Sequence, residues 1–155
     1  MLARSTKSLL LKKIIEDFNQ FTFQQGDSFA WQSRTNTIVY SNGGNFFPLL
    51  LHEIAHALLG HKAYGLDIDL LNKENAAWQH ALQVLAPVYS LEIDESFIEL
   101  CLDDYRAWLY KRSLCPACGQ TGLQIKKNVY SCINCGGAWK TNDARQCGLR
   151  RVRLT

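Results

Sequence analysis

Four cysteines near the end of the chain constrain its fold more than any other feature. Cys115 and Cys118 form one C-x-x-C pair, Cys132 and Cys135 form a second pair, and 13 residues lie between the two pairs. Two such pairs at this distance are typical of a tetrahedral four-cysteine structural zinc site. Because the segment holds too few apolar residues for a core, we expect metal binding to supply much of its folding energy. The sequence therefore predicts a four-cysteine zinc ribbon, with "LQIKKNVYS" as a hairpin.

Helical periodicity ends where the ribbon begins, which places a predicted domain boundary near residue 113. In the preceding segment, "DSFAWQSRTNTIVYSNGG" favours two short strands that form a hairpin. We therefore predict an α+β fold: a domain (1–112) of helices and a short antiparallel sheet, then a ribbon with a basic C-terminal tail (113–155). Apolar residues recur at helical spacing over residues 5–20, from about residue 47, over 71–89 with Asn72 as the cap, and from 90 to about 112.

The composition is that of a chain that packs a core. Of its 155 residues, 47% are hydrophobic and 20% are charged, which excludes a disordered chain. No apolar run reaches the roughly 18 residues needed to span a membrane, and the first residues do not read as a signal peptide. Cysteines paired for metal also favour a reducing compartment. We therefore expect a cytoplasmic protein without a membrane partner.

Positive charge is concentrated in the ribbon. Residues 1–110 carry 8 Lys and Arg against 13 Asp and Glu, whereas residues 111–155 carry 9 against 1. Tyr130 and Trp139 are interleaved with these basic residues, so the ribbon could contact phosphates and stack on nucleic-acid bases. A structural clip with a solvated basic face explains the same pattern. A nucleic-acid partner and a purely structural role therefore both remain open.

The stretch "LLHEIAHALLGH" (50–61) carries the second metal motif. His52 and His56 are four residues apart, so on a helix both can point at one ion. Glu53 lies beside them, where it could take a proton from a metal-bound water, as in the H-E-x-x-H zinc hydrolases. Since the pattern fixes only three residues, two hydrogen-bonded core histidines would explain it equally well.

A third ligand is needed, and Glu74 is the first candidate. It shares a helical stripe with Ala77 and Trp78, in line with a core. A carboxylate is rarely buried unless it is paired or binds metal. A first-turn glutamate favoured by the helix dipole is the alternative interpretation. His61, five residues after His56, is the competing ligand, although its spacing is not that of metzincins.

The predicted chemistry is peptide hydrolysis of the gluzincin type. Zinc lowers the pKa of a bound water to about 7, and Glu53 accepts the proton and returns it to the leaving amine. The strand in "NTIVYS" could align an extended substrate along its edge, and Tyr89 and His61 are the candidates for stabilising the oxyanion. The expected cofactors are two Zn²⁺ ions, one catalytic and one structural.

"LLHEIAHALLGH" followed by "ENAAWQHALQVLAP" resembles the ImmA/IrrE-like zinc metallopeptidases over roughly residues 5–105. In that family, two motif histidines and a glutamate from the next helix bind the metal, and members cleave regulatory DNA-binding proteins in the cytosol. The resemblance implies His52, His56 and Glu74 as ligands, Glu53 as the base and a DNA-binding regulator as substrate. The chain departs from the family at Trp78, where a small polar residue is common, and in its ribbon.

Two other interpretations remain. SprT-like peptidases are also similar, with H-E-x-x-H, a helix that carries an aromatic residue and ends in proline, and frequently a zinc ribbon, which implies a DNA-associated protease. Their third ligand is a histidine, where this chain has Glu74. In the other interpretation the chain is a non-catalytic nucleic-acid-binding adaptor that acts through its ribbon.

Overall fold

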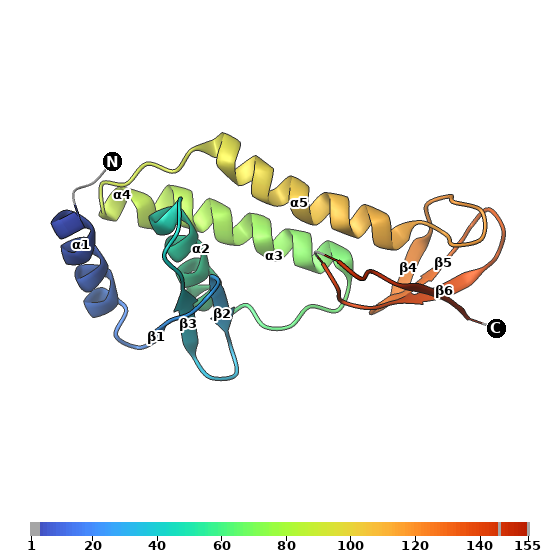
Figure 1. Cartoon of the computed structure of the whole chain (residues 1–155), viewed down its shortest axis with the longest axis horizontal. Coiled ribbons are helices and arrows are strands. Elements are labelled where there is room, and N and C mark those ends of the chain that lie inside the picture. The colour runs from blue at the N-terminus through green and yellow to red at the C-terminus, as the bar shows by residue number, and fades with distance from the viewer. Residues whose placement is uncertain (1–3, 146, 155) are drawn as a thin grey trace. The chain divides into compact units, whose positions relative to one another are not determined.

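The computed structural model describes residues 4–145 and 147–154 and shows an α+β chain with two small sheets. Within these residues, no helix has both the length and the apolar character needed to cross a membrane. In chain order (Figure 1), the elements are α1 (Arg4–Asp17), β1 (Thr22–Gln25), β2 (Ala30–Gln32), β3 (Thr37–Tyr40), α2 (Phe46–Leu58), α3 (Asp67–His80), the π-helix η1 (Ala81–Leu85), α4 (Ala86–Val88), α5 (Glu95–Ser113), β4 (Leu123–Lys126), β5 (Val129–Ser131), β6 (Ala138–Thr141) and β7 (Arg151–Leu154).

The chain divides into two compact units, which are described separately. One unit comprises residues up to Lys62 together with Ala76–Asp94, and the other comprises Ala63–Asn75 together with residues from Glu95 onward. The division falls inside α3, which is a continuous helix. The predicted start of the ribbon near residue 113 coincides with the last residue of α5.

The first unit contains a three-stranded sheet with the order β1-β3-β2. The predicted hairpin is confirmed, because β2 pairs antiparallel with β3. The sequence did not predict β1, which pairs parallel with β3 and whose short "TFQQ" lacks alternation. As a result β3, the strand of "NTIVYS", lies at the centre and is paired on both sides. The prediction that this strand offers an edge is therefore wrong, since the edges are β1 and β2.

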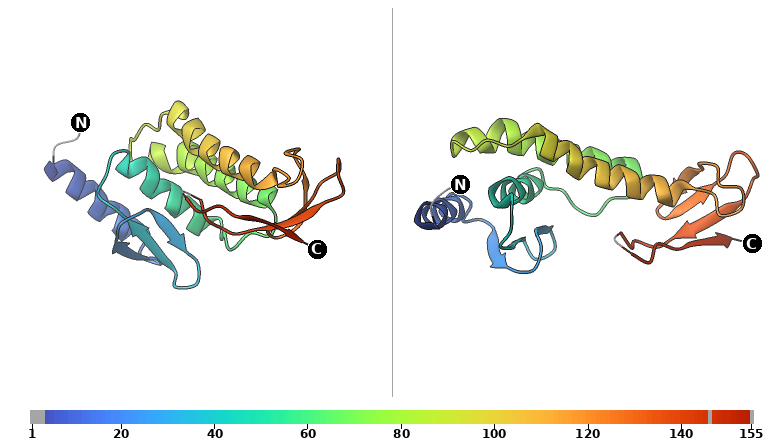
Figure 2. Two further views of the ribbon diagram at one scale, coloured as in Figure 1. Left: turned by 45° about the vertical axis from the view of Figure 1, so that its right-hand side comes forward. Right: turned by 45° about the horizontal axis from the view of Figure 1, so that its top comes forward.

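Helix α2 packs on β2 and β3 (Figure 2). It begins at Phe46, one residue from the predicted start, and is more apolar than α1, α3 and α5. Leu50, Leu51 and Ile54 on this helix have no exposed surface. Their burial holds the helix against the sheet, because apolar area removed from water is the main favourable term in folding. The histidines of "HEIAH" lie on the same buried helix.

Helix α3 begins five residues before the predicted cap at Asn72. The main-chain N–H of Leu66 donates to the Asp69 carboxylate over 3.0 Å, and Asp67 and Asp69 form an acidic first turn. These acids favour the helix N-terminus through its dipole. The prediction of Asn72 as the cap is wrong, because the apolar stripe used to place it starts later than the helix. The predicted end near Pro87 is confirmed, since the helical run continues through η1 to α4.

The second unit contains a four-stranded antiparallel sheet with the order β4-β5-β6-β7. The predicted hairpin is confirmed as β4 and β5. Tyr130 and Trp139 are opposite each other in register and stack, with ring centroids 5.5 Å apart. A Cβ at Gly122 would lie 2.3 Å from the Trp139 ring, so only glycine fits this close approach. These two rings pack with Cys115 and Cys132 as a small core.

Arg112, at the end of α5, is completely buried. A last-turn arginine is expected to be solvated near the helix dipole. Instead, its guanidinium donates to the Tyr130 hydroxyl over 3.1 Å and to the Asn128 side chain over 2.5 Å. It also lies 3.6 Å from the Asp67 carboxylate, which accepts a hydrogen bond from Tyr130. This buried ion pair attaches the ribbon to the first turn of α3.

We predict that Arg112→Ala destabilises the protein by about 3–5 kcal/mol, because it removes a buried cation and leaves the partly buried Asp67 carboxylate without its partner. The free energy of unfolding, measured in urea, tests this. Arg106 is the matched control, since it is also an arginine of α5 that forms ion pairs, with Glu99 and Asp103, but on an exposed surface. Arg106→Ala should change the free energy of unfolding little, because exposed ion pairs contribute little to stability. Equal losses in the free energy of unfolding for the two variants would contradict this prediction.

Candidate metal centres

Three side chains with metal-ligating atoms come together in a buried group. His52, His56 and Glu74 are 5%, 8% and 6% exposed, and one ligand atom from each lies within 4.8 Å of the others. The two histidines lie on successive turns of α2, as the four-residue spacing predicts. Glu74 lies inside α3, so it is not a frayed first-turn glutamate. This group could hold a metal ion.

The spacing of the ligand atoms fits zinc. Nε2 of His52 lies 3.1 Å from Nε2 of His56. A tetrahedral zinc with bonds of 2.0–2.1 Å holds two nitrogens about 3.3 Å apart. Two imidazoles and one carboxylate are also the protein ligands of a class of catalytic zinc sites, in which a fourth position stays open. The donor set and its geometry are therefore compatible with a zinc ion.

Trp78 explains how His52 is held. Its indole stacks on the His52 ring, with centroids 4.1 Å apart and planes 23° apart, and it is 1% exposed. Trp78 follows Glu74 by four residues, so both side chains lie on one face of α3. The same helix face thus supplies the carboxylate and the ring that fixes His52. The large aromatic side chain at this position therefore has a structural reason.

His61 lies behind His56 and outside the three-residue group. Its Nδ1 is 2.8 Å from Nδ1 of His56, on the side of the ring away from His52. The structure therefore places Glu74, and not His61, with the two histidines. A partner on Nδ1 orients an imidazole and leaves Nε2 for a metal. His61 thus acts as an outer partner of His56, a role that only the structure reveals.

Glu53 lies next to the histidines and contacts the sheet. Its carboxylate accepts a hydrogen bond from the main-chain N–H of Trp31 on β2, over 2.7 Å. The indole N–H of Trp31 donates to the carbonyl of His61 over 2.9 Å. The candidate base is therefore held against the edge strand. The sequence gives no signal for Trp31 as the partner of Glu53, because the donor is a main-chain N–H and does not depend on the type of residue.

The Tyr89 side chain is bonded to α1. Its hydroxyl donates to the Asp17 carboxylate on α1 over 2.9 Å, and its ring is 8% exposed. Burial, and then the Asp17 carboxylate, raise the pKa of Tyr89 well above its usual range. A hydroxyl committed to α1 cannot stabilise an oxyanion beside His52. Tyr89 as the oxyanion-stabilising residue is therefore a wrong prediction.

The four ribbon cysteines form the second group. Cys115, Cys118, Cys132 and Cys135 each bring a sulfur within 4.8 Å of the others. Two pairs of sulfurs are 3.7 Å and 3.5 Å apart, close to the roughly 3.8 Å expected around a tetrahedral zinc with 2.3 Å bonds. All six cysteines of the chain are free thiols. This group too could hold a metal ion.

The two C-x-x-C turns have the same local structure. Gly119 and Gly136 have φ of +75° and +72°. Each donates its N–H to the main-chain carbonyl of the first cysteine of its pair over 2.9 Å. Glycine reaches this left-handed conformation without steric cost. Hydrogen bonds from the Gln120 main chain and the Asn134 side chain lower the pKa of Cys118 to about 6. The thiolate, which is the form that binds metal, is therefore favoured there.

No protein-family model, no curated protein and no solved structure matches this chain. Its function therefore has to be inferred from its own residues.

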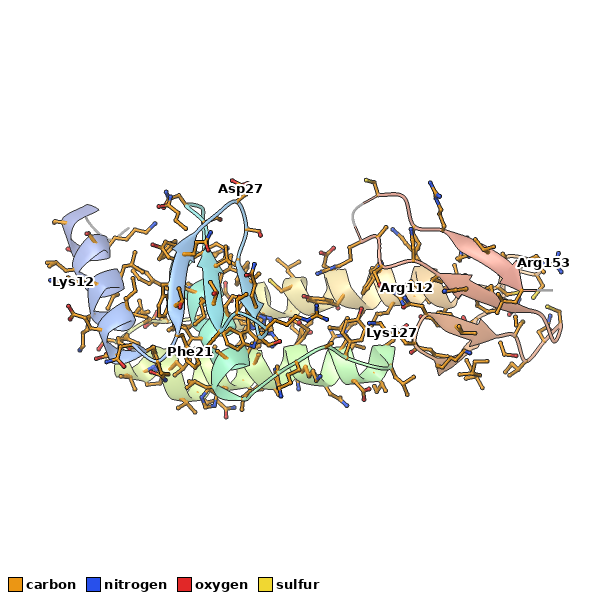
Figure 3. All side chains as sticks on the ribbon, turned by 90° about the horizontal axis from the view of Figure 1, so that it is seen from below. Lys12, Phe21, Asp27, Arg112, Lys127 and Arg153 are labelled. Atoms are coloured by element: carbon orange, nitrogen blue, oxygen red, sulfur yellow. The ribbon has the colours of Figure 1, made fainter. Side chains whose placement is uncertain are left out.

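The ribbon surface differs from its predicted form. Tyr130 and Trp139 are 1% and 0% exposed, so they cannot stack on bases, and that prediction is wrong. The two rings alternate with basic residues because the sheet has one packed face and one solvated face. The basic side chains are exposed, as Lys127 and Arg153 illustrate in Figure 3. Phosphate contact by these residues stays a prediction.

We predict two zinc ions per chain, one in each group. His52→Ala and Glu74→Ala should each leave one zinc, while Cys147→Ser, at an exposed cysteine outside both groups, should leave two. Elemental analysis of the purified variants gives the number. With cobalt in place of zinc, the remaining site in His52→Ala should keep its sulfur-to-metal charge-transfer bands. Retention of two metals in both ligand variants would contradict the His52/His56/Glu74 site.

Proposed function

We propose that this chain is a zinc-dependent metallopeptidase. The observation that carries the proposal is the burial of His52, His56 and Glu74 with their ligand atoms close together, and Glu53 follows His52 directly on the same helix. Two imidazoles and a carboxylate offer a divalent ion three ligands and leave further positions for water and substrate. In this proposal residues 1–112 form a zincin-like domain and the four-cysteine ribbon has a structural role. The His52/His56/Glu74 group and the four cysteines each bind one zinc ion.

The chain's own residues would act as follows. His52, His56 and Glu74 would hold a zinc ion, which would supply Lewis-acid chemistry to the peptide carbonyl and to water. Glu53 accepts a proton from the attacking water, whose oxygen bonds to the carbonyl carbon. When the C–N bond breaks, Glu53 delivers that proton to the leaving nitrogen. Trp78 and His61 keep the rings of His52 and His56 in place.

The edge of β2 is the surface we propose for substrate. An extended peptide can add to a free strand edge through main-chain hydrogen bonds. Strand β2 is an edge of its sheet and its residue Trp31 contacts Glu53. A peptide on β2 would therefore run past the candidate base. Strand β3, the strand first expected to have this role, is paired on both sides.

Glu74 favours the ImmA/IrrE-like family over the SprT-like family. SprT-like peptidases use a histidine as the third ligand, whereas here a buried glutamate lies with the two motif histidines. We therefore propose a regulatory, DNA-associated protein of the cytoplasm as substrate, by resemblance to that family. The ribbon remains the feature that is more similar to SprT-like proteins.

A nucleic-acid-binding role of the ribbon is the second candidate. Seven of its basic residues are exposed and could neutralise phosphates: Lys126, Lys127, Lys140, Arg145, Arg150, Arg151 and Arg153. Because the aromatic rings are buried, such binding would depend on charge and weaken steeply with salt. In the adaptor form of this proposal the chain has no catalytic activity.

We predict that Glu53→Gln keeps two zinc ions per chain but loses hydrolysis by at least about 10²-fold, since the amide cannot accept the proton. Hydrolysis of labelled β-casein by the zinc-loaded full chain measures the rate. Glu99→Gln, at an exposed glutamate of α5, is the control and should keep the wild-type rate.

Two outcomes would contradict the peptidase proposal. Equal rates for the wild type and Glu53→Gln would exclude Glu53 as the base. A fully metallated chain that hydrolyses nothing but binds nucleic acid with a steep salt dependence would favour the adaptor.

A further inference from the structure

Trp31, on the edge strand β2, contacts both the candidate base Glu53 and His61, the outer partner of the candidate ligand His56. Its main-chain N–H donates to the Glu53 carboxylate over 2.7 Å. Its indole N–H donates over 2.9 Å to the carbonyl of His61, whose ring contacts His56. The indole also packs edge-on against Phe21, with centroids 5.5 Å apart. One partly buried residue therefore touches the candidate base and the outer partner of a candidate ligand.

The register of the hairpin shows which way the Trp31 main chain faces. Trp31 is opposite Ile38 on β3. In an antiparallel pair, the N–H and C=O of one residue point to the same side, and successive residues alternate between the partner strand and the free edge. Because the Trp31 N–H reaches Glu53, both main-chain groups of Trp31 face the free edge. Glu53 thus occupies the position where the carbonyl of an added strand would accept a hydrogen bond.

We propose that Trp31 is a positioning residue that couples the docking of an extended peptide on β2 to the placement of Glu53. Without a peptide, the Trp31 amide holds the carboxylate at the strand edge. A peptide that pairs with β2 supplies its own carbonyl to this amide, and the Glu53 carboxylate is then released to accept the proton of the attacking water. This inference rests on the proposed function.

The coupling has a physical reason. A carboxylate oxygen that accepts a hydrogen bond from a main-chain amide is held at that amide, so it is not directed at an attacking water. Transfer of the amide to a peptide carbonyl removes this hydrogen bond only when substrate is present. Meanwhile the indole contact to His61 keeps the His56 ring oriented, because outer partners of metal-binding histidines fix the ring.

The contact itself is tested by hydrogen exchange at the Trp31 amide, measured by NMR on the zinc-loaded full chain. An outward-facing edge amide should exchange rapidly unless it is bonded. We expect protection in the wild type and in Glu53→Gln, whose amide oxygen still accepts the bond. In Glu53→Ala the exchange should be about 10-fold faster or more. Unchanged protection in Glu53→Ala would overturn the contact.

The coupling is tested by the binding of labelled β-casein to the same two variants, neither of which can use Glu53 as a base. Glu53→Ala leaves the edge amide available, so it should bind casein about 2- to 10-fold more tightly than Glu53→Gln, the range expected for one hydrogen bond. In a Trp31→Pro background, which lacks the amide, this difference should disappear. Equal affinities of Glu53→Ala and Glu53→Gln would overturn the coupling.

The two measurements separate this inference from the proposed function. If the exchange pattern holds and wild-type protein does not hydrolyse casein, the peptidase proposal fails while the contact stands. If hydrolysis depends on Glu53 but the two variants bind casein equally, the peptidase proposal stands and the coupling fails. A control for the indole is Trp31→Phe, which keeps the amide and should keep its protection.

Discussion

Burial of a carboxylate beside two imidazoles is the constraint on which the first metal group depends. Moving an ionised carboxylate out of water costs several kcal/mol unless a cation or hydrogen bonds replace the water. Glu74 is 6% exposed and lies with His52 and His56, which are equally buried. A divalent ion among these three groups would offset that cost, and neutral imidazole nitrogens are suited to bind it. The surrounding contacts, with Trp78 on one ring and His61 on the other, then serve to keep the ligands aligned.

The ribbon depends on a different source of stability, because it has little apolar surface to bury. Its core consists of two stacked rings and two cysteines. A metal held by four sulfurs would add the missing folding free energy. The buried pair of Arg112 with Asp67, bridged by Tyr130, then attaches this small sheet to α3 and α5. A buried ion pair adds little net stability. Removal of either partner nevertheless destabilises the protein strongly, because the other charge is left without a counter-ion.

What could be predicted from the sequence was encoded locally. The spacing of His52, His56 and the four cysteines places ligand atoms through the geometry of one helix or one turn, and the structure brings each set together. Burial of Arg112 could not be predicted, since its partners are distant in sequence and its position at a helix end suggests solvent. Tyr130 and Trp139 were misinterpreted for a related reason. Alternation of aromatic and basic residues is the same for a nucleic-acid surface and for a sheet with one packed face.

The hairpin between β2 and β3 has more influence on the proposed site than its size suggests. Since successive residues of a strand face opposite sides, a slip of one residue would turn the Trp31 amide toward β3 and away from Glu53. The turn that sets this register contains Asn36, which has a φ of +54° and whose side chain donates to the carbonyl of Gln20 over 2.7 Å. Asparagine tolerates this left-handed conformation better than most residues. A surface turn far from the metal ligands in sequence therefore determines which main-chain group meets the proposed catalytic base.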